Sequence, residues 1–309
     1  MTVSGESNIL EARTTFQNLV SNAFLENRSQ GLWERFASKF GADGLVTQIP
    51  VPLVGSLFER WVGDKVARGI HMLSVDVPFD KLHATKVFQR SQVEHDNTGA
   101  TEMALNAFLR DQGYLWDQLT FDTIASNAVG PDGVALLADA HPHGANGATW
   151  DNLTTDALSH EAVKVGRAAM QELQDIDGNY LSIVPDTLLV GPADERLARE
   201  IFEADIRVFG VAGNGAVDSG TRIAAAGATN VYEGAGTVVV TPRMTGSGWR
   251  LVDSRFPCIG IVSWRDPEAV ILDRKEDLPR FMRDELHYSI ESDANAKPIH
   301  PWSIYGAVS

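Results

Sequence analysis

The sequence predicts an α+β protein, because helical and strand-like hydrophobic patterns occupy separate stretches of the chain. An amphipathic helix comes first, followed by a pair of strands, a long helix, a mixed segment and a series of strands. The helical stripe at 98–127 and the strands between 231 and 263 are the clearest patterns. With 309 residues, of which 44% are hydrophobic, the chain can form one large or two moderate domains.

The N-terminal segment, residues 8–40, carries a hydrophobic face typical of an amphipathic helix. This face comprises Ile9, Ala12, Phe16, Leu19, Val20, Ala23 and Phe24. Such a helix docks on another part of the fold, docks on a neighbouring subunit, or is an ordinary core helix. The sequence leaves these three placements open.

Two strands are predicted next, at Val46 to Val51 and at His71 to Phe79, where apolar and polar residues alternate. The prolines Pro50, Pro52 and Pro78 would interrupt a central strand, so the pair is expected at an edge. The chain between the strands combines large apolar residues with charges. Because an isolated hairpin is marginal in water, this one must lie on another surface.

A single long helix is expected over residues 98–127. Its apolar stripe, which we take as its core-facing side, consists of Leu105, Phe108, Leu109, Leu115, Trp116 and Leu119. Thr98 and Thr101 are candidate N-caps. Gly113 lies in the middle of the stretch and weakens the helix by about 1 kcal/mol relative to alanine.

The remaining elements follow from shorter signals. Ser159 is the expected N-cap of a helix at 161–174, and Pro192 begins a helix that ends at Phe202. Residues 210–229 are rich in Gly and Ala and predict an irregular surface loop. Strands are expected at 185–190, 231–232, 237–241, 249–252 and 259–263, and a short helix at 277–285.

Composition limits the functional classes. The net charge of −15, from 41 acidic and 26 basic residues, argues against a dedicated nucleic-acid binder, which needs a basic face. The single cysteine, Cys258, excludes an intrachain disulfide and is interpreted as a small buried apolar residue. No stretch approaches the roughly 18 consecutive apolar residues of a membrane-spanning helix.

No motif specifies enzymatic chemistry or a cofactor. Asp139, His141 and His143 could contribute to a metal site, but they lack a further ligand at a recognisable spacing, so we predict no metal. Gly213 and Gly215 begin like a dinucleotide-binding motif, yet Asp218 occupies the third glycine position. A nucleophile elbow of the G-x-S-x-G type is absent. We therefore expect a protein that is not an enzyme.

The order of several motifs resembles the middle of tailed-bacteriophage major capsid proteins, and most closely the Mu-like major head subunits. The stretches that carry the resemblance are Leu136 to Gly144, Trp150 to Leu153, Ala157 to Ser159, Asp177 and Gly178, and Pro185 to Pro192. Before them, Trp61 to Lys65 and His71 to Phe79 resemble the extended loop of that family. After them, Asn230 to Gly234 and Val238 to Met244 resemble its axial-domain strand.

The resemblance implies the Hong Kong 97-type (HK97-like) capsid fold. It divides the chain into four parts, with the spine helix at 98–127 in the peripheral domain and residues 210–229 near the capsomer axis. These parts are an N-terminal arm (1–44), an extended β-hairpin loop (45–92), a peripheral domain (93–157 and 281–309) and an axial domain (158–280). The extended loop would contact a neighbouring subunit through Leu57, Phe58, Arg60, Trp61, Lys65 and Arg68.

The implied function is that of a major capsid protein in the virion of a double-stranded DNA phage, made and assembled in the host cytoplasm. Its partners would be other copies in pentamers and hexamers, a separate scaffold or protease-scaffold, a portal and a decoration protein, with no membrane. The shell would enclose the DNA without sequence-specific binding. Two alternatives remain: an encapsulin-like bacterial shell protein, and a soluble α/β enzyme that uses the Gly-rich loop at 210–229.

Overall fold

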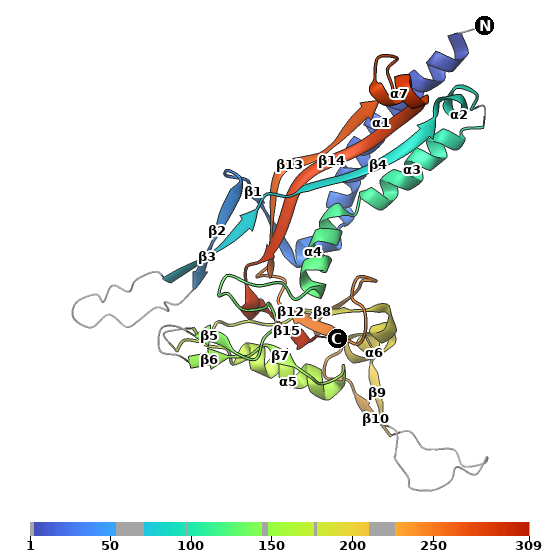
Figure 1. Ribbon diagram of the computed structural model, residues 1–309. Helices are drawn as coiled ribbons and strands as arrows, with labels where there is room; N and C mark the ends of the chain where they lie inside the picture. Colours follow the sequence, from blue (N-terminus) through green and yellow to red (C-terminus); the bar gives the residue numbers. More distant parts are fainter. Residues whose placement is uncertain are drawn as a thin grey trace, which may run out of the picture. The chain divides into compact units, whose positions relative to one another are not determined.

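The computed structural model describes residues 3–53, 71–96, 98–143, 148–175, 178–209 and 226–308. These residues form a mixed helix and sheet protein that divides into two compact units (Figure 1). Unit 1 comprises Met1–Pro50, Ser74–Thr123 and Ile259–Ile299. Unit 2 comprises Val51–Leu73, Ile124–Cys258 and His300–Ser309.

Unit 1 contains the longest helices and strands of the described chain. The elements that lie wholly or mainly in it are α1 (Val3–Gln30), a 3-10 turn (Leu32–Arg35), β1 (Ala37–Gly41), β2 (Val46–Leu53), β3 (His71–Pro78), β4 (Lys81–Gln89), α2 (Arg90–Glu94), α3 (Ala100–Gln112), α4 (Leu115–Ala125), β13 (Ile259–Leu272), α7 (Leu278–Arg283) and β14 (Glu285–Pro298).

A four-stranded sheet in the order β1-β13-β14-β4 forms the centre of unit 1. β1 runs parallel to β13, while β14 pairs antiparallel with both β13 and β4. Successive side chains of a strand point to opposite faces, so Leu286, Tyr288 and Ile290 of β14 share one face. On that face they pack in one buried cluster with residues of α1 and α3 (Figure 1).

β2 and β3 form a separate two-stranded sheet, as the alternating pattern predicts. The base of this pair is buried on its own subunit, with Ile49, Val75 and Val77 inaccessible to solvent. Gly260 of β13 permits the close approach, because a Cβ there would lie 2.7 Å from Ile49 Cδ1. Both strands are therefore edge strands, as predicted. The base of the pair, however, packs on the same chain.

The extended loop was expected to continue to residue 92, but β4 belongs to the central sheet. Its residues pair with β14, for example Ala84 with Ile290. Likewise, β13 reaches Leu272 although the sequence predicted a strand only to Ser263, and the long strand β14 was not predicted. Local sequence patterns do not predict which strands pair, because a strand can form its hydrogen bonds with a segment that is distant in the sequence.

The single helix expected at 98–127 is two helices, α3 and α4, separated at Gly113 and Tyr114. Gly113 caps α3 with dihedrals that stay helical (φ −56°, ψ −22°), so the interruption is slight. Neither Thr98 nor Thr101 is the N-cap. Gly99 occupies that position, and the carboxylate of Asp96 accepts hydrogen bonds from the backbone N–H groups of the first turn.

Unit 2 is built from shorter elements. They are β5 (His141–His143), β6 (Ala148–Trp150), β7 (Leu153–Thr154), α5 (His160–Gln171), β8 (Thr187–Val190), a 3-10 turn (Pro192–Asp194), α6 (Glu195–Phe202), β9 (Ile206–Phe209), β10 (Ala226–Thr229), β11 (Thr237–Val240), β12 (Trp249–Val252), a 3-10 turn (Pro301–Ser303) and β15 (Ile304–Ala307).

A five-stranded mixed sheet, in the order β11-β8-β12-β15-β7, carries the core of unit 2. β8 and β12 are buried along their whole length. The predicted N-cap is confirmed, since Ser159 Oγ accepts a hydrogen bond of 3.1 Å from the N–H of Ala162. Cys258 is buried as expected, and burial raises the pKa of its thiol to about 12.

The boundaries of the two units differ from the domain limits drawn from the sequence. Residues 124–157 and 300–309 group with unit 2, whereas 259–280 group with unit 1. The exchange follows from strand pairing, because β13 pairs with β14 and β15 with β12. Within 210–229, residues 226–229 form β10 against β9, and residues 210–225 lie outside the described chain.

Candidate assembly elements and the cavity beside α1

The N-terminal helix α1 docks on its own subunit. Ile9, Phe16 and Val20 are buried against α2, α3 and the central sheet. The Phe16 ring meets the Tyr288 ring edge-on, with 5.3 Å between centroids. Of the three placements that the sequence left open, the structure shows packing on another part of the same fold.

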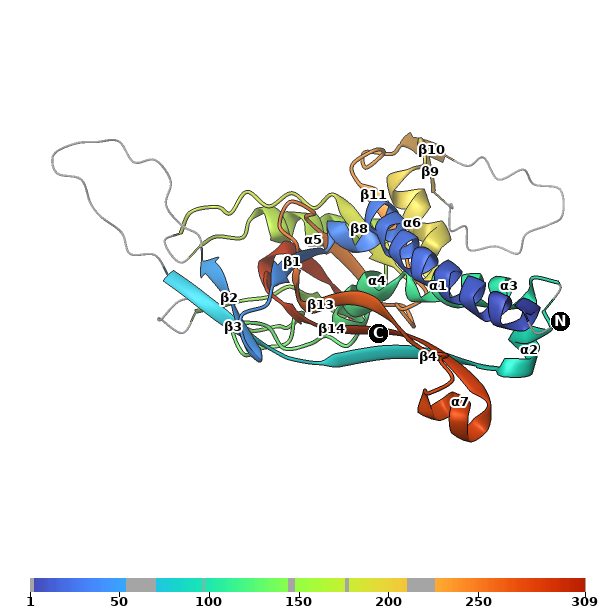
Figure 2. The same cartoon turned by 90° about the horizontal axis from the view of Figure 1, so that it is seen from above.

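The apex of the β13–β14 hairpin carries the short helix α7 (Figure 2). Arg280 holds this apex in place, since its Nη1 donates to the carbonyl of Asp273 at 2.7 Å. At the far end, Arg90 Nε donates to the Asp284 carboxylate at 2.5 Å, which ties the apex to α2. The apex is therefore anchored at both ends to unit 1.

Three apolar side chains of α7 face solvent. Leu278 is 71% exposed, Phe281 77% and Met282 67%. Single exposed apolar residues are common on protein surfaces, but three on one short helix form a patch. These three residues, at the helical spacing i, i+3 and i+4, define the patch on the α7 apex.

The residues proposed for the spine-helix core occupy two environments. Leu105 and Leu109 are buried in the cluster that contains α1, and Phe108 packs at its margin. Trp116 of α4 is 5% exposed, and Lys39 Nζ of β1 lies 4.4 Å from the centroid of its ring. Leu115 and Leu119 are half-buried. The break at Gly113 thus separates the residues that pack with α1 from Trp116, which contacts Lys39 of β1.

The residues proposed for the extended-loop contact lie outside the described chain, which omits 54–70. These are Leu57, Phe58, Arg60, Trp61, Lys65 and Arg68. The strands that lead to them, β2 and β3, are described and paired.

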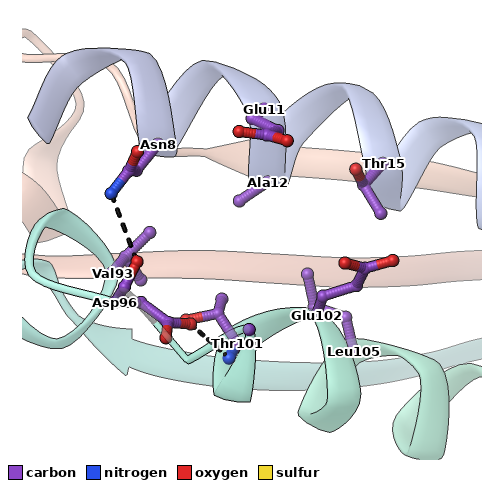
Figure 3. A pocket seen from close by; sticks show the side chains of 10 residues that line it. Asn8, Glu11, Ala12, Thr15, Val93, Asp96, Thr101, Glu102 and Leu105 are labelled. Atoms are coloured by element: carbon purple, nitrogen blue, oxygen red, sulfur yellow. Dashed lines mark hydrogen bonds between the residues drawn. The ribbon is translucent and has the colours of Figure 1, made fainter. Parts of the chain in front are cut away.

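A cavity of about 260 Å³ lies between α1 and the start of α3. Asn8, Glu11 and Thr15 line it from α1, and Asp96, Thr101 and Glu102 from the α3 side (Figure 3). Asn8 Nδ2 donates to the backbone carbonyls of Glu94 and Asp96, at 3.3 and 3.4 Å, and so closes one end.

The carboxylates beside this cavity are unsuited to acid–base catalysis. Backbone hydrogen bonds from Thr101 and Thr98 hold the pKa of Asp96 well below its usual range, so it does not carry a proton near neutral pH. Glu11 and Glu102 are exposed to solvent. The arrangement caps a helix, and nothing in it resembles a nucleophile paired with a base.

Of the three sequence candidates for a metal site, the structure describes the side chains of Asp139 and His141. His141 is buried, and both its ring nitrogens are taken, at 2.6 Å from Asp132 Oδ2 and 3.0 Å from Asn152 Oδ1. Asp139 is exposed, and the side chain of His143 is not described. In the described part of the chain, no group of three or more His, Cys, Asp or Glu residues is arranged to hold a metal ion.

Sequence reasoning missed two polar pairs that join distant segments: Arg13 with Asp273, and His141 with Asp132. No local motif marks either pair. A polar residue on an otherwise apolar helix face, such as Arg13 between Ile9 and Phe16, is the one available signal for the first.

Comparison with known proteins identifies the family. The model of a phage capsid protein family matches residues 90–307, which is more than half of the chain and includes parts of both units. The chain belongs to this phage capsid protein family. None of the curated proteins matches it in sequence.

Several solved phage structures share the fold. A chain of the bacteriophage JBD30 procapsid aligns with a TM-score of 0.57 at 13% identity, covering 97% of this chain and 75% of that chain. The capsid of Ralstonia phage GP4 aligns with a TM-score of 0.55 at 10% identity, covering 89% of both chains. The bacteriophage JBD30 capsid gives a TM-score of 0.51 at 14% identity, over 70% of this chain and 91% of that one.

The capsid protein described here is therefore a structural component of a phage virion, and its family and fold are those of a major capsid protein. Among the described residues, no helix combines the length and apolar character needed to cross a membrane. The functionally relevant parts of the chain are consequently the surfaces through which one subunit would contact another.

Proposed function

We propose that this chain is a Mu-like major head subunit with the Hong Kong 97-type domain plan, and that it assembles into pentamers and hexamers of an icosahedral shell around double-stranded DNA. The family match over residues 90–307 is the observation that carries the proposal. It favours a phage shell over the encapsulin-like and enzymatic alternatives. In this assignment unit 1 is the peripheral domain and unit 2 the axial domain.

The extended loop supplies the first subunit contact in this proposal. β2 and β3 lead out from a base that is buried on the subunit's own sheet. The residues between them include aromatic, aliphatic and Arg side chains, a combination frequent in the centre of protein interfaces. Leu57, Phe58 and Trp61 would anchor on the neighbouring subunit, while Arg60, Lys65 and Arg68 fix the register.

The patch on the α7 apex supplies a second contact. Its three apolar side chains gain nothing from exposure to water, whereas each would release free energy on burial against another copy. The anchored apex presents them without a large ordering cost, because the helix is already fixed to α2 and β13.

A scaffold or protease-scaffold, a portal and a decoration protein complete the proposed set of partners. The net charge of −15 suits a wall that encloses DNA without gripping it, since like charges on protein and phosphate repel. We assign the chain no enzymatic activity and no cofactor. In keeping with this, Asp96, which lines the cavity between α1 and α3, accepts hydrogen bonds at the start of α3 and so caps that helix.

The test replaces residues 56–69 with a short Gly-Ser turn. We expect a folded subunit, with unchanged circular dichroism and melting temperature, that no longer forms closed particles in sedimentation and negative-stain microscopy. Normal shells from this variant, or a subunit that unfolds outright, would contradict the extended-loop assignment.

A point variant tests the α7 contact independently. Phe281→Asp should leave the melting temperature of the unassembled subunit within a few degrees and reduce the yield of shells at least tenfold. Phe281→Leu is the matched control, because it keeps an apolar side chain at the same place and should assemble normally. Equal shell yields from the two variants would remove α7 from the interface.

A further inference from the structure

His141 occupies an unusual polar position inside unit 2. It lies in β5, its side chain is fully buried, and each ring nitrogen has a side-chain oxygen within hydrogen-bond distance. Nδ1 lies 2.6 Å from Oδ2 of Asp132, in the turn after α4, and Nε2 lies 3.0 Å from Oδ1 of Asn152, just after β6. Which ring nitrogens carry a proton therefore depends on whether each of these two oxygens donates or accepts the hydrogen bond.

The orientation of the Asn152 amide is determined by its other contacts. Its Nδ2 donates to two backbone carbonyls, those of Leu136 at 2.8 Å and Pro301 at 2.9 Å. Its Oδ1 accepts from the N–H of Ala138 at 2.9 Å. A reversed amide would place an oxygen against two carbonyls and an NH₂ group against an N–H. Oδ1 must therefore face the ring, where it can only accept.

Asp132 also presents an acceptor. Its Oδ1 accepts from the N–H of Val134 at 3.2 Å, and its Oδ2 faces Nδ1 of the ring. A neutral imidazole has one N–H, so one of its two nitrogens would turn a lone pair toward an oxygen lone pair. An ionised ring donates from both nitrogens and satisfies both oxygens, and the 2.6 Å separation is typical of a charge-assisted hydrogen bond.

We infer that His141 is a doubly protonated imidazolium in the folded capsid protein and that its ion pair with Asp132 is a brace that holds the turn at Asp132 to β5 and to Asn152. The brace joins the turn after α4, the strand β5, Asn152 just before β7 and the segment at Pro301. This joins parts of unit 2 that no long helix or strand connects.

The surroundings of the ring suit a cation. The Trp150 ring stacks on it with 4.3 Å between centroids and 16° between planes, and an indole face attracts positive charge. The other carboxylates of the segment, Asp139 and Asp151, are exposed, so Asp132 is the charged group that bonds the ring among the described residues. His300, next to Pro301, donates from Nδ1 to the Pro257 carbonyl, and burial lowers its pKa.

The test is NMR of the full chain labelled with ¹⁵N histidine, as unassembled subunits in solution or as sedimented shells in the solid state. The His141 ring is assigned through its contact with the Trp150 indole. At pH 7 we expect both ring nitrogens in the protonated range of chemical shift. One nitrogen in the unprotonated range at this pH would overturn the inference.

Asp132→Asn tests the partner. The new amide can donate to Nδ1, so the ring should become neutral with its proton on Nε2, and one nitrogen signal should move to the unprotonated range. Asp139→Asn, a change of an exposed carboxylate in the same segment, should leave both signals in place. A ring that stays doubly protonated in Asp132→Asn would exclude Asp132 as its counterion. If this variant fails to fold, the unaltered chain alone still decides the protonation state.

Discussion

Arg13 and Asp273 form a two-bond ion pair although they lie 260 residues apart in the sequence. Arg13 Nε donates to Asp273 Oδ2 at 3.1 Å, and its Nη2 donates to Oδ1. Asp273 follows the last residue of β13 and is 1% exposed, while the Arg13 side chain is 26% exposed. The hydrogen bond to Asp273 raises the pKa of Arg13, so the guanidinium stays charged. The pair joins α1 to the end of the central sheet.

Arg13→Ala should destabilise the unassembled subunit by about 3 kcal/mol, because it leaves the buried carboxylate of Asp273 without its cation. The value lies at the lower end of the usual range since Arg13 itself is partly solvated. Urea unfolding of the subunit measures the change. Arg274→Ala, the removal of an exposed arginine next to Asp273, is the control and should cost less than about 0.5 kcal/mol. Equal effects of the two changes would show that the ion pair contributes nothing.

Trp116→Ala should cost about 3 to 5 kcal/mol, as large-to-small changes in a packed core do. The indole is nearly inaccessible to solvent, and the substitution also removes its contact with Lys39, whose Nζ lies 4.4 Å from the ring centroid. Tyr114→Ala, two residues earlier and exposed, should have a small effect. Denaturant unfolding compares the two variants, and a loss below about 1 kcal/mol for Trp116→Ala would mean that α4 packs through a different face.

Gly306→Ala should destabilise unit 2 by about 3 kcal/mol or prevent folding. A Cβ at this position of β15 would lie 2.0 Å from the backbone oxygen of Trp249 in β12, and a paired strand cannot move away without losing its hydrogen bonds. Gly41→Ala is the matched control in a strand, because a Cβ there meets nothing within 4 Å. Thermal melting of both variants checks the prediction, which a normal melting temperature for Gly306→Ala would refute.

Asp253 should stabilise the folded chain at neutral pH, and this contribution should decrease as the pH falls. Burial raises the pKa of its carboxyl, but hydrogen bonds from Arg255 and from the N–H of Val184 outweigh burial and leave the pKa below its ordinary value. A lowered folded-state pKa means that the contribution is present above the unfolded-state value near pH 3.9 and is lost as pH falls through the folded-state pKa.

Asp253→Asn should therefore cost about 1.5 to 3 kcal/mol at pH 7, the usual size of a hydrogen bond to a charged group, and progressively less as pH falls below 4. Melting temperatures of the variant and the unaltered chain from pH 7 to pH 3 give the comparison. Asp151→Asn, at an exposed carboxylate, is the control. A difference that stays constant over this range would show that the charge of Asp253 does not contribute to the stability of the folded chain.

Short-range signals in the sequence were sufficient for several elements. The Ser159 cap, the helix that ends at Phe202 and the buried strand at β8 follow from capping chemistry and hydrophobic periodicity, which act over a few residues. The same local logic also explains the error at Gly113. The apolar stripe continues across the glycine, so periodicity alone could not show that α3 ends and α4 begins there.

By itself the sequence determined the mixed helix and strand content, the acidic balance and the absence of a catalytic motif, because these depend on composition and near neighbours. Only the tertiary structure decided that β4 joins the central sheet and that β13 and β14 are long. It alone placed Arg13 on Asp273 and both nitrogens of His141 against oxygens. The physical reason is common to all of these. Strand pairing and buried polar bonds satisfy groups from distant segments, and a partner is specified only when the chain has brought it within about 3 Å.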